Sequence, residues 1–284
     1  MYAESFEYHA PNTLQEAVGL LQQYGDDAKV LTGGMSLIPL MKLRLAAPKH
    51  VIDLRKVGDL EGVSESGGNV VIGARTTHGA LETSQVLREK CPVVAQTAAQ
   101  IGDVQVRNRG TIGGSLVHAD PAADLPAAML ALDAQITLHG KSERTMGAGE
   151  FFQAALMSAA EPDEILTRIT VPQTGKHTAY AKFAQPASGF ALVGVAAVLE
   201  MDGNTCKSAR IGVTGVCDTA FRATSVEQAL AGQSLSGDAV RAAAEKIDGD
   251  ITDPLDDPVN ASADYRRHLA RVFTARAVQQ ALSA

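Results

Sequence analysis

Two glycine pairs, each lying between an apolar segment and a helix-like segment, constrain this chain more than any other feature of it. The first pair lies in KVLTGGMS (29–36) and the second in RGTIGGSLVHADPAAD (109–124). Glycine has no Cβ, so backbone N–H groups around it can approach an anion closely, as they do around phosphates. We interpret the two segments as loops that share one diphosphate. A purely structural role for the glycines is the alternative, because Gly-Gly-x-Ser turns between strand and helix are common.

The usual nucleotide-binding fingerprints are missing. The chain contains no G-x-G-x-x-G motif, and the Gly189 to Gly194 spacing is followed by Val195 where a Walker motif has lysine. A Rossmann nicotinamide site and a Walker NTPase are therefore disfavoured.

Length and charge narrow the class of protein further. A chain of 284 residues suggests two domains at about 100–200 residues each. It has 25 Lys and Arg against 32 Asp and Glu, a net charge of −7, which argues against nucleic acid or an anionic membrane as the main partner. With no Trp and 4% aromatic residues, few rings are available to stack on a planar ligand.

Cysteine usage and the amino terminus indicate a cytoplasmic protein. The three cysteines, Cys91, Cys206 and Cys217, include no C-x-x-C pair, so we expect reduced thiols rather than a disulfide, zinc or iron–sulfur framework. The opening MYAESFEYHAPN shows no basic segment followed by an apolar run, so no signal peptide is expected.

The order of predicted elements gives an α+β fold. A strand, glycine turn, short helix and strand occupy about 29–54, and a polar glycine-rich stretch at 102–124 precedes the apolar segment LPAAMLALD (125–133). After PQTGKHTAY (172–180) the pattern changes to three apolar strands and then three helices, which predicts a small antiparallel sheet covered by helices on one face.

These patterns place the domain boundary near residue 175. We expect a first domain at 1–175, in two parts of about 1–57 and 58–175, and a second domain at 176–284.

Candidate catalytic groups are few. His118, Asp120 and Asp124 resemble a metal or acid–base cluster, but Pro121 favours a simpler interpretation in which Asp120 caps the helix that Pro121 begins. Asp124 then faces the glycine loop, where it can accept hydrogen bonds from ligand hydroxyls. We therefore predict no catalytic residue and no metal ligand. The remaining histidines form no H-E-x-x-H motif or close pair: His9, His50, His78, His139, His177 and His268.

At the two glycine loops the chain resembles a known family. LTGGMSLIPLMKLRLAAPKHVIDL (31–54) and RNRGTIGGSLVHADPAADLPAAMLAL (107–132) are similar to the AGG-x-S and RN-x-GTIGG segments of the FAD-binding medium subunit of molybdenum hydroxylases. Carbon monoxide dehydrogenase and xanthine dehydrogenase belong to that group. The resemblance covers nearly the whole chain and implies a two-part FAD-binding domain of the PCMH or vanillyl-alcohol-oxidase type, followed by a small C-terminal domain.

The resemblance also implies a set of cofactor-binding residues. The first loop would wrap the diphosphate and the second would form the other half of the cradle, while Asp124 would bind ribityl or nearby hydroxyls. Ile101, Leu166 and Lys182 match positions near the cofactor, and Phe190 lies where some relatives place a ring near the isoalloxazine. The complete implied set is Lys29, Val30, Leu31, Thr32, Gly33, Gly34, Met35, Ser36, Ile101, Thr111, Gly113, Gly114, Ser115, Asp124, Leu166, Lys182 and Phe190.

Two positions depart from the family pattern. Met35 stands where the carbon monoxide dehydrogenase subunit typically has His, and Thr32 replaces the usual Ala. FAD binding is compatible with Met35 if only its backbone touches phosphate, but the substrate cannot be transferred from carbon monoxide dehydrogenase.

The implied function is electron transfer through FAD. Molybdopterin and 2Fe–2S clusters are expected on partners, namely a large molybdopterin-binding subunit and a small iron–sulfur subunit in a heterotrimer or its dimer. Any membrane association would be peripheral and through partners only. A free-standing FAD oxidase or reductase of the same fold is the alternative, and a non-enzymatic scaffold is a third.

Overall fold

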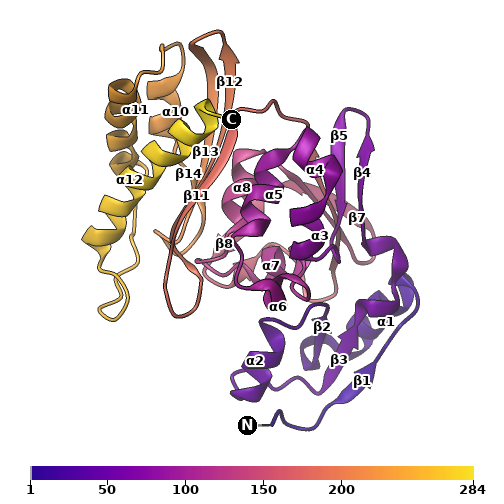
Figure 1. Ribbon diagram of the computed structural model, residues 1–284. Coiled ribbons are helices and arrows are strands. Elements are labelled where there is room, and N and C mark those ends of the chain that lie inside the picture. The colour runs from indigo at the N-terminus through magenta and orange to yellow at the C-terminus, as the bar shows by residue number, and fades with distance from the viewer. Residues whose placement is uncertain (1) are drawn as a thin grey trace.

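The computed structural model describes residues 2–284, which form three units in chain order (Figure 1). Three buried apolar clusters centre on these units, and two of the clusters also take in residues of a neighbouring unit, such as Val198 and Ile165. The first unit is a three-stranded parallel sheet of order β1-β3-β2. Helix α1 packs its Ala17, Val18 and Leu21 stripe into that unit's core, and Thr13 Oγ1 caps it by accepting the Glu16 N–H at 3.2 Å. Its elements are β1 (Glu7–His9), α1 (Leu14–Tyr24), β2 (Ala28–Leu31), α2 (Leu37–Lys42) and β3 (His50–Asp53).

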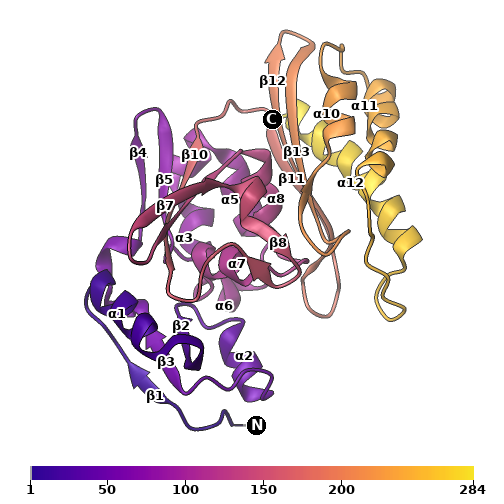
Figure 2. The same ribbon diagram turned by 180° about the vertical axis from the view of Figure 1, so that it is seen from behind.

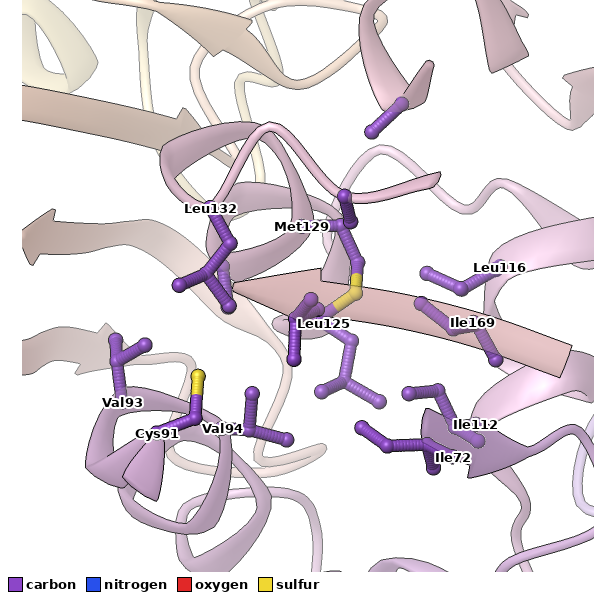
Figure 3. Close-up of a cluster of buried hydrophobic side chains, with 14 of the residues drawn as sticks. Ile72, Cys91, Val93, Val94, Ile112, Leu116, Leu125, Met129, Leu132 and Ile169 are labelled. Carbon is purple, nitrogen blue, oxygen red and sulfur yellow. The ribbon is translucent and has the colours of Figure 1, made fainter. Parts of the chain in front are cut away.

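The second unit is a five-stranded antiparallel sheet of order β4-β5-β10-β6-β7 with helices packed against it. Its core joins sheet residues such as Ile72 and Ile169 to α8 residues such as Leu125 and Met129 (Figure 3). The strands of this sheet are β4 (Val63–Ser66), β5 (Asn69–Gly73), β6 (Gln135–His139), β7 (Glu143–Gly147) and β10 (Ile165–Pro172). A separate two-stranded antiparallel sheet is formed by β8 (Phe152–Ala154) and β9 (Met157–Ser158). The helices are α3 (His78–Thr83), α4 (Gln85–Lys90), α5 (Pro92–Ala99), α6 (Val104–Arg107), α7 (Ile112–His118), α8 (Leu125–Ala131) and α9 (Ala148–Phe151).

The third unit is a four-stranded antiparallel sheet whose outer face carries three helices (Figure 2). The expected helix layer is present, but the inner face of the sheet is covered too, by α5 and α8 of the second unit. This double cover explains the apolar run at 191–199, where every residue is buried. The elements are β11 (Thr178–Ala184), β12 (Ala191–Asp202), β13 (Thr205–Thr214), β14 (Phe221–Arg222), α10 (Thr224–Leu230), α11 (Gly237–Ala244) and α12 (Ala263–Leu282).

No helix within residues 2–284 has both the length and the apolarity needed to cross a membrane.

One glycine sets how closely the second and third units pack. A Cβ on Gly212 of β13 would lie 1.9 Å from the carbonyl oxygen of Ala127 in α8. We expect Gly212→Ala to lower the free energy of unfolding by about 3 kcal/mol, because backbone must move to admit the methyl group. Denaturant unfolding measures this loss. Gly149→Ala is the control, since nothing lies within 4 Å of that Cβ, and equal stability of the two variants would contradict the expectation.

Candidate cofactor-binding site

The first glycine loop connects the end of β2 to the start of α2 and leaves several backbone donors unused. Within residues 2–284, the N–H groups of Gly33, Gly34, Met35 and Ser36 have no hydrogen-bond acceptor. Gly34 has φ of +77°, a conformation that favours glycine. Unused N–H groups next to a helix amino terminus favour an anion, because the local dipoles point positive charge outward.

The second glycine segment, expected to be a loop throughout, instead has its glycine pair in the first turn of α7, and it uses its amide donors differently. The name second glycine loop is kept for this segment. Thr111 caps the helix, with its Oγ1 accepting the Gly114 N–H at 3.2 Å. The Gly113 N–H donates to the carbonyl oxygen of Ala74 at 2.8 Å, and a Cβ on Gly113 would lie 2.7 Å from that of Ala74. Gly113 therefore serves close packing, while exposed Gly114 keeps the loop surface open.

The two loops touch, although 79 residues separate the threonines that join them. Thr32 Oγ1 lies 3.0 Å from Thr111 Oγ1. Gly33 packs so tightly on the second loop that its Cβ would lie 2.1 Å from the Arg109 carbonyl oxygen. Gly114 faces the same junction, since its Cβ would lie 3.2 Å from Thr32 Oγ1. The fold thus forms one continuous surface from the two glycine segments.

A cationic pocket of about 160 Å³ opens beside this junction. Arg55 is paired with Asp53, and Arg75 donates to Glu61 at 3.2 Å. Arg109 forms no ion pair within residues 2–284, so its guanidinium is available to an anionic ligand. The lining residues are Thr32, Arg55, Glu61, Arg75, Thr77, Asn108, Arg109 and Thr111.

Asp124 and Lys182 form a buried ion pair between the second and third units. Lys182 Nζ lies 2.9 Å from Asp124 Oδ2 and also donates to the Gln100 carbonyl oxygen at 2.9 Å. The hydroxyl of Tyr180 donates to Asp124 Oδ1 at 2.5 Å. Burial raises the pKa of Asp124, while the Lys182 ammonium and the Tyr180 hydroxyl act in the opposite direction. Burial and the adjacent carboxylate raise the pKa of Tyr180.

The predicted helix start at Pro121 was wrong. Helix α8 begins at Leu125 with Asp124 as its N-cap residue and Pro126 in the first turn. Asp120 instead accepts the Ala122 N–H at 2.8 Å, in a turn that precedes the helix. The sequence missed this because Pro126 is as suitable for a first turn as Pro121.

The other cofactor-binding residues implied by the family resemblance differ in how deeply they are buried. Lys29, Val30 and Leu31 form strand β2, which delivers the chain to the first loop. Leu166 is buried in the second unit's core, and Ile101 packs partly buried against the same core. Among residues 2–284, no hydrogen bond or ion pair links Leu166 to the Asp124–Lys182 pair.

Phe190 lies apart from these residues, exposed at 48%, in the hairpin between β11 and β12. That hairpin approaches the Ile101 region, since a Cβ on Gly189 would lie 3.6 Å from the Cα of Gly102.

Sequence reasoning missed three residues of this region: Arg109, Tyr180 and Gln100. Arg109 stands directly beside the second glycine motif, and its charge was the signal that pointed to it. Tyr180 and Gln100 gave no signal, because only the packing of β11 on α5 brings them to the buried pair.

Comparisons with known proteins agree with this architecture. A family described as "FAD binding domain in molybdopterin dehydrogenase" matches residues 4–174, and one described as "CO dehydrogenase flavoprotein C-terminal domain" matches residues 178–281. The carbon monoxide dehydrogenase medium chain of Afipia carboxidovorans is 42% identical over 284 residues, covering 99% of this chain and 98% of the relative. The glyceraldehyde dehydrogenase medium chain of Sulfolobus acidocaldarius is 36% identical over 282 residues, covering 99% of both chains.

A solved structure of carbon monoxide dehydrogenase from Hydrogenophaga pseudoflava superposes with a TM-score of 0.95 at 41% identity, covering 100% of this chain and 99% of the other. The fold and the paired glycine loops define an FAD-binding oxidoreductase subunit. The chain belongs to the family of carbon monoxide dehydrogenase-like medium subunits of molybdenum hydroxylases. The family resemblance drawn from the two glycine segments is confirmed.

Proposed function

We propose that this chain is the electron-transfer subunit of a molybdenum hydroxylase complex. It relays electrons from the iron–sulfur clusters of a small partner subunit, through FAD, to an external acceptor. A large molybdopterin-binding subunit completes a heterotrimer or its dimer. Several relatives support this proposal, since they are named as one chain or subunit of a dehydrogenase.

The observation that carries the proposal is the contact between the two glycine loops. The first loop offers four unused N–H donors, and the second meets it through the 3.0 Å Thr32–Thr111 contact. Oriented amides bind phosphate oxygens without much positive charge, and the pocket beside the loops adds Arg109, which forms no ion pair within residues 2–284. These donors fit the diphosphate of FAD.

FAD supplies the redox chemistry when bound, and the chain's residues bind and orient it. The backbone of residues 33–36 would hold phosphate oxygens, and the Thr111 and Ser115 hydroxyls would bind from the second loop. Because Met35 would contribute only its N–H, the usual His at this position is not needed for phosphate binding. The Asp124–Lys182 pair fixes the third unit against the second and leaves both side chains occupied.

The proposal extends to domains and location. We assign a first domain at 1–175, with parts of about 1–57 and 58–175, and a second at 176–284, supported by the family matches that end at residue 174 and begin at residue 178. We also propose a cytoplasmic protein, supported by three buried cysteines in the free thiol state.

Isolation from the native host tests the relay. We expect the chain to co-purify with molybdenum and iron, and a reducing substrate to bleach its flavin absorption only within that complex. Carbon monoxide, glyceraldehyde and nicotine are the anaerobic probes, with dithionite as the positive control. An FAD-loaded chain free of molybdenum and iron that a probe reduces as fast as the complex would show a free-standing oxidase instead.

A further inference from the structure

Three potential metal ligands gather on the first unit's sheet, away from the glycine loops. Strands β1 and β3 run parallel with Glu7 opposite His50 and His9 opposite Ile52. Because side chains alternate along a strand, Glu7, His9 and His50 share one face. Sequence spacing predicted no metal site, since 41 residues separate the two histidines that the fold brings together.

The ligand atoms lie at coordination spacing. His9 Nε2 is 3.1 Å from His50 Nδ1, and Glu7 Oε2 is 3.6 Å from the same nitrogen. One donor atom from each residue lies within 4.8 Å of the others. Two nitrogens at ~2.0–2.1 Å from a tetrahedral zinc ion are about 3.3 Å apart, so the two imidazoles need little movement to share an ion.

Neighbouring side chains hold the group in place. The Tyr24 ring stacks on His50 with centroids 3.6 Å apart and planes 12° from parallel, which limits rotation of that imidazole. The His50 side chain is 16% exposed and the Glu7 side chain 72%, so the carboxylate is free to swing in from solvent. Lys49, which directly precedes His50 in the chain, is paired with Asp27 at 2.9 Å. It therefore does not compete with a metal ion for the Glu7 carboxylate.

We propose that Glu7, His9 and His50 form a binding site for a divalent transition metal, with Zn²⁺ the best match. Two imidazoles and one carboxylate are a common zinc ligand set, which leaves the fourth position for water or for a group from a partner. The site lies at the first residue of β3, whereas the glycine loop follows the last residue of β2. Three residues along the strand, at a rise of ~3.3 Å each, place the metal site and the glycine loop about 10 Å apart along the sheet.

Zinc titration of the chelator-treated full chain tests the site. A chromophoric chelator competes for the metal, and we expect one equivalent bound with an affinity that His9→Ala and His50→Ala each lower about 100-fold, since losing even an outer-shell partner costs ~10–100-fold. Glu7→Gln is expected to weaken binding less. When Co²⁺ replaces Zn²⁺, we expect visible absorption bands with the intensity of a four- or five-coordinate Co²⁺ ion. The two alanine variants should lose these bands.

His268→Ala is the matched control, because this histidine is exposed on α12 and far from the group in the chain. Circular dichroism and FAD content must match the wild type in each variant, and His9→Gln replaces any variant that fails this check. Substoichiometric zinc in the wild type, or an unchanged affinity in both histidine variants, overturns the proposal.

Discussion

Gly114→Trp is expected to weaken FAD binding strongly. Gly114 is exposed on α7, and its missing side chain faces the Thr32–Thr111 junction, so an indole there would cover the surface where the two loops meet. We expect the FAD affinity to fall by about 100-fold or more, equivalent to about 2.7 kcal/mol. Fluorescence titration of the deflavinated chain with FAD measures the change.

Gly149→Trp is the control for this experiment. Gly149 is also an exposed helical glycine, and nothing lies within 4 Å of its Cβ position. Gly34→Trp is a weaker test, because φ of +77° would strain any side chain there. Normal FAD affinity in folded Gly114→Trp would contradict the diphosphate assignment and favour a structural role for the glycines.

Lys182→Met is expected to lower the free energy of unfolding by about 3–5 kcal/mol, the usual cost of removing one partner from a buried ion pair. The side chains of Lys182 and Asp124 are 2% and 5% exposed, so the remaining carboxylate would stay without water. Removing the ammonium raises the pKa of Asp124 further above its ordinary 3.8. The folded-state pKa of Asp124 is therefore higher in the variant than in the wild type, so the deficit should be fully present at pH values above both and should shrink as the pH falls through the interval between them.

Urea unfolding across this pH range checks the expectation, with Lys49→Met as the control. The Lys49–Asp27 pair is exposed, at 72% and 53%, and its loss should cost no more than about 1 kcal/mol. Equal losses in the two variants, or a Lys182→Met deficit that does not change with pH, would contradict a buried charged pair.

Local patterns predicted much of this fold. The strand, glycine turn and helix around Gly33 are present, and so are the helices that end the chain, but the second glycine pair, expected in a loop, lies in the first turn of α7. Gly67 and Gly203 occupy turns, with φ of +56° and +57° and open space at Cβ. These features depend on residues close in sequence, where backbone preferences act directly.

Long-range packing could not be predicted in the same way. The contact of Gly33 with Arg109, the closeness of Gly212 to α8 and the Asp124–Tyr180 hydrogen bond each join segments more than 50 residues apart. All four paired glycines have a packing or backbone reason in the structure, since a Cβ on Gly114 would lie 3.0 Å from Thr111 Oγ1, and Gly114 alone of the four is exposed. A glycine pair thus indicates that another group comes close to the backbone. Only the fold shows whether that group belongs to the protein or to a ligand.

The joined glycine loops are proposed to hold FAD. The most direct measurement is the visible spectrum of the purified chain with its partners present, with flavin quantified after denaturation. We expect close to one FAD per chain, released as intact dinucleotide. A complex that contains this chain and binds no stoichiometric FAD would contradict it.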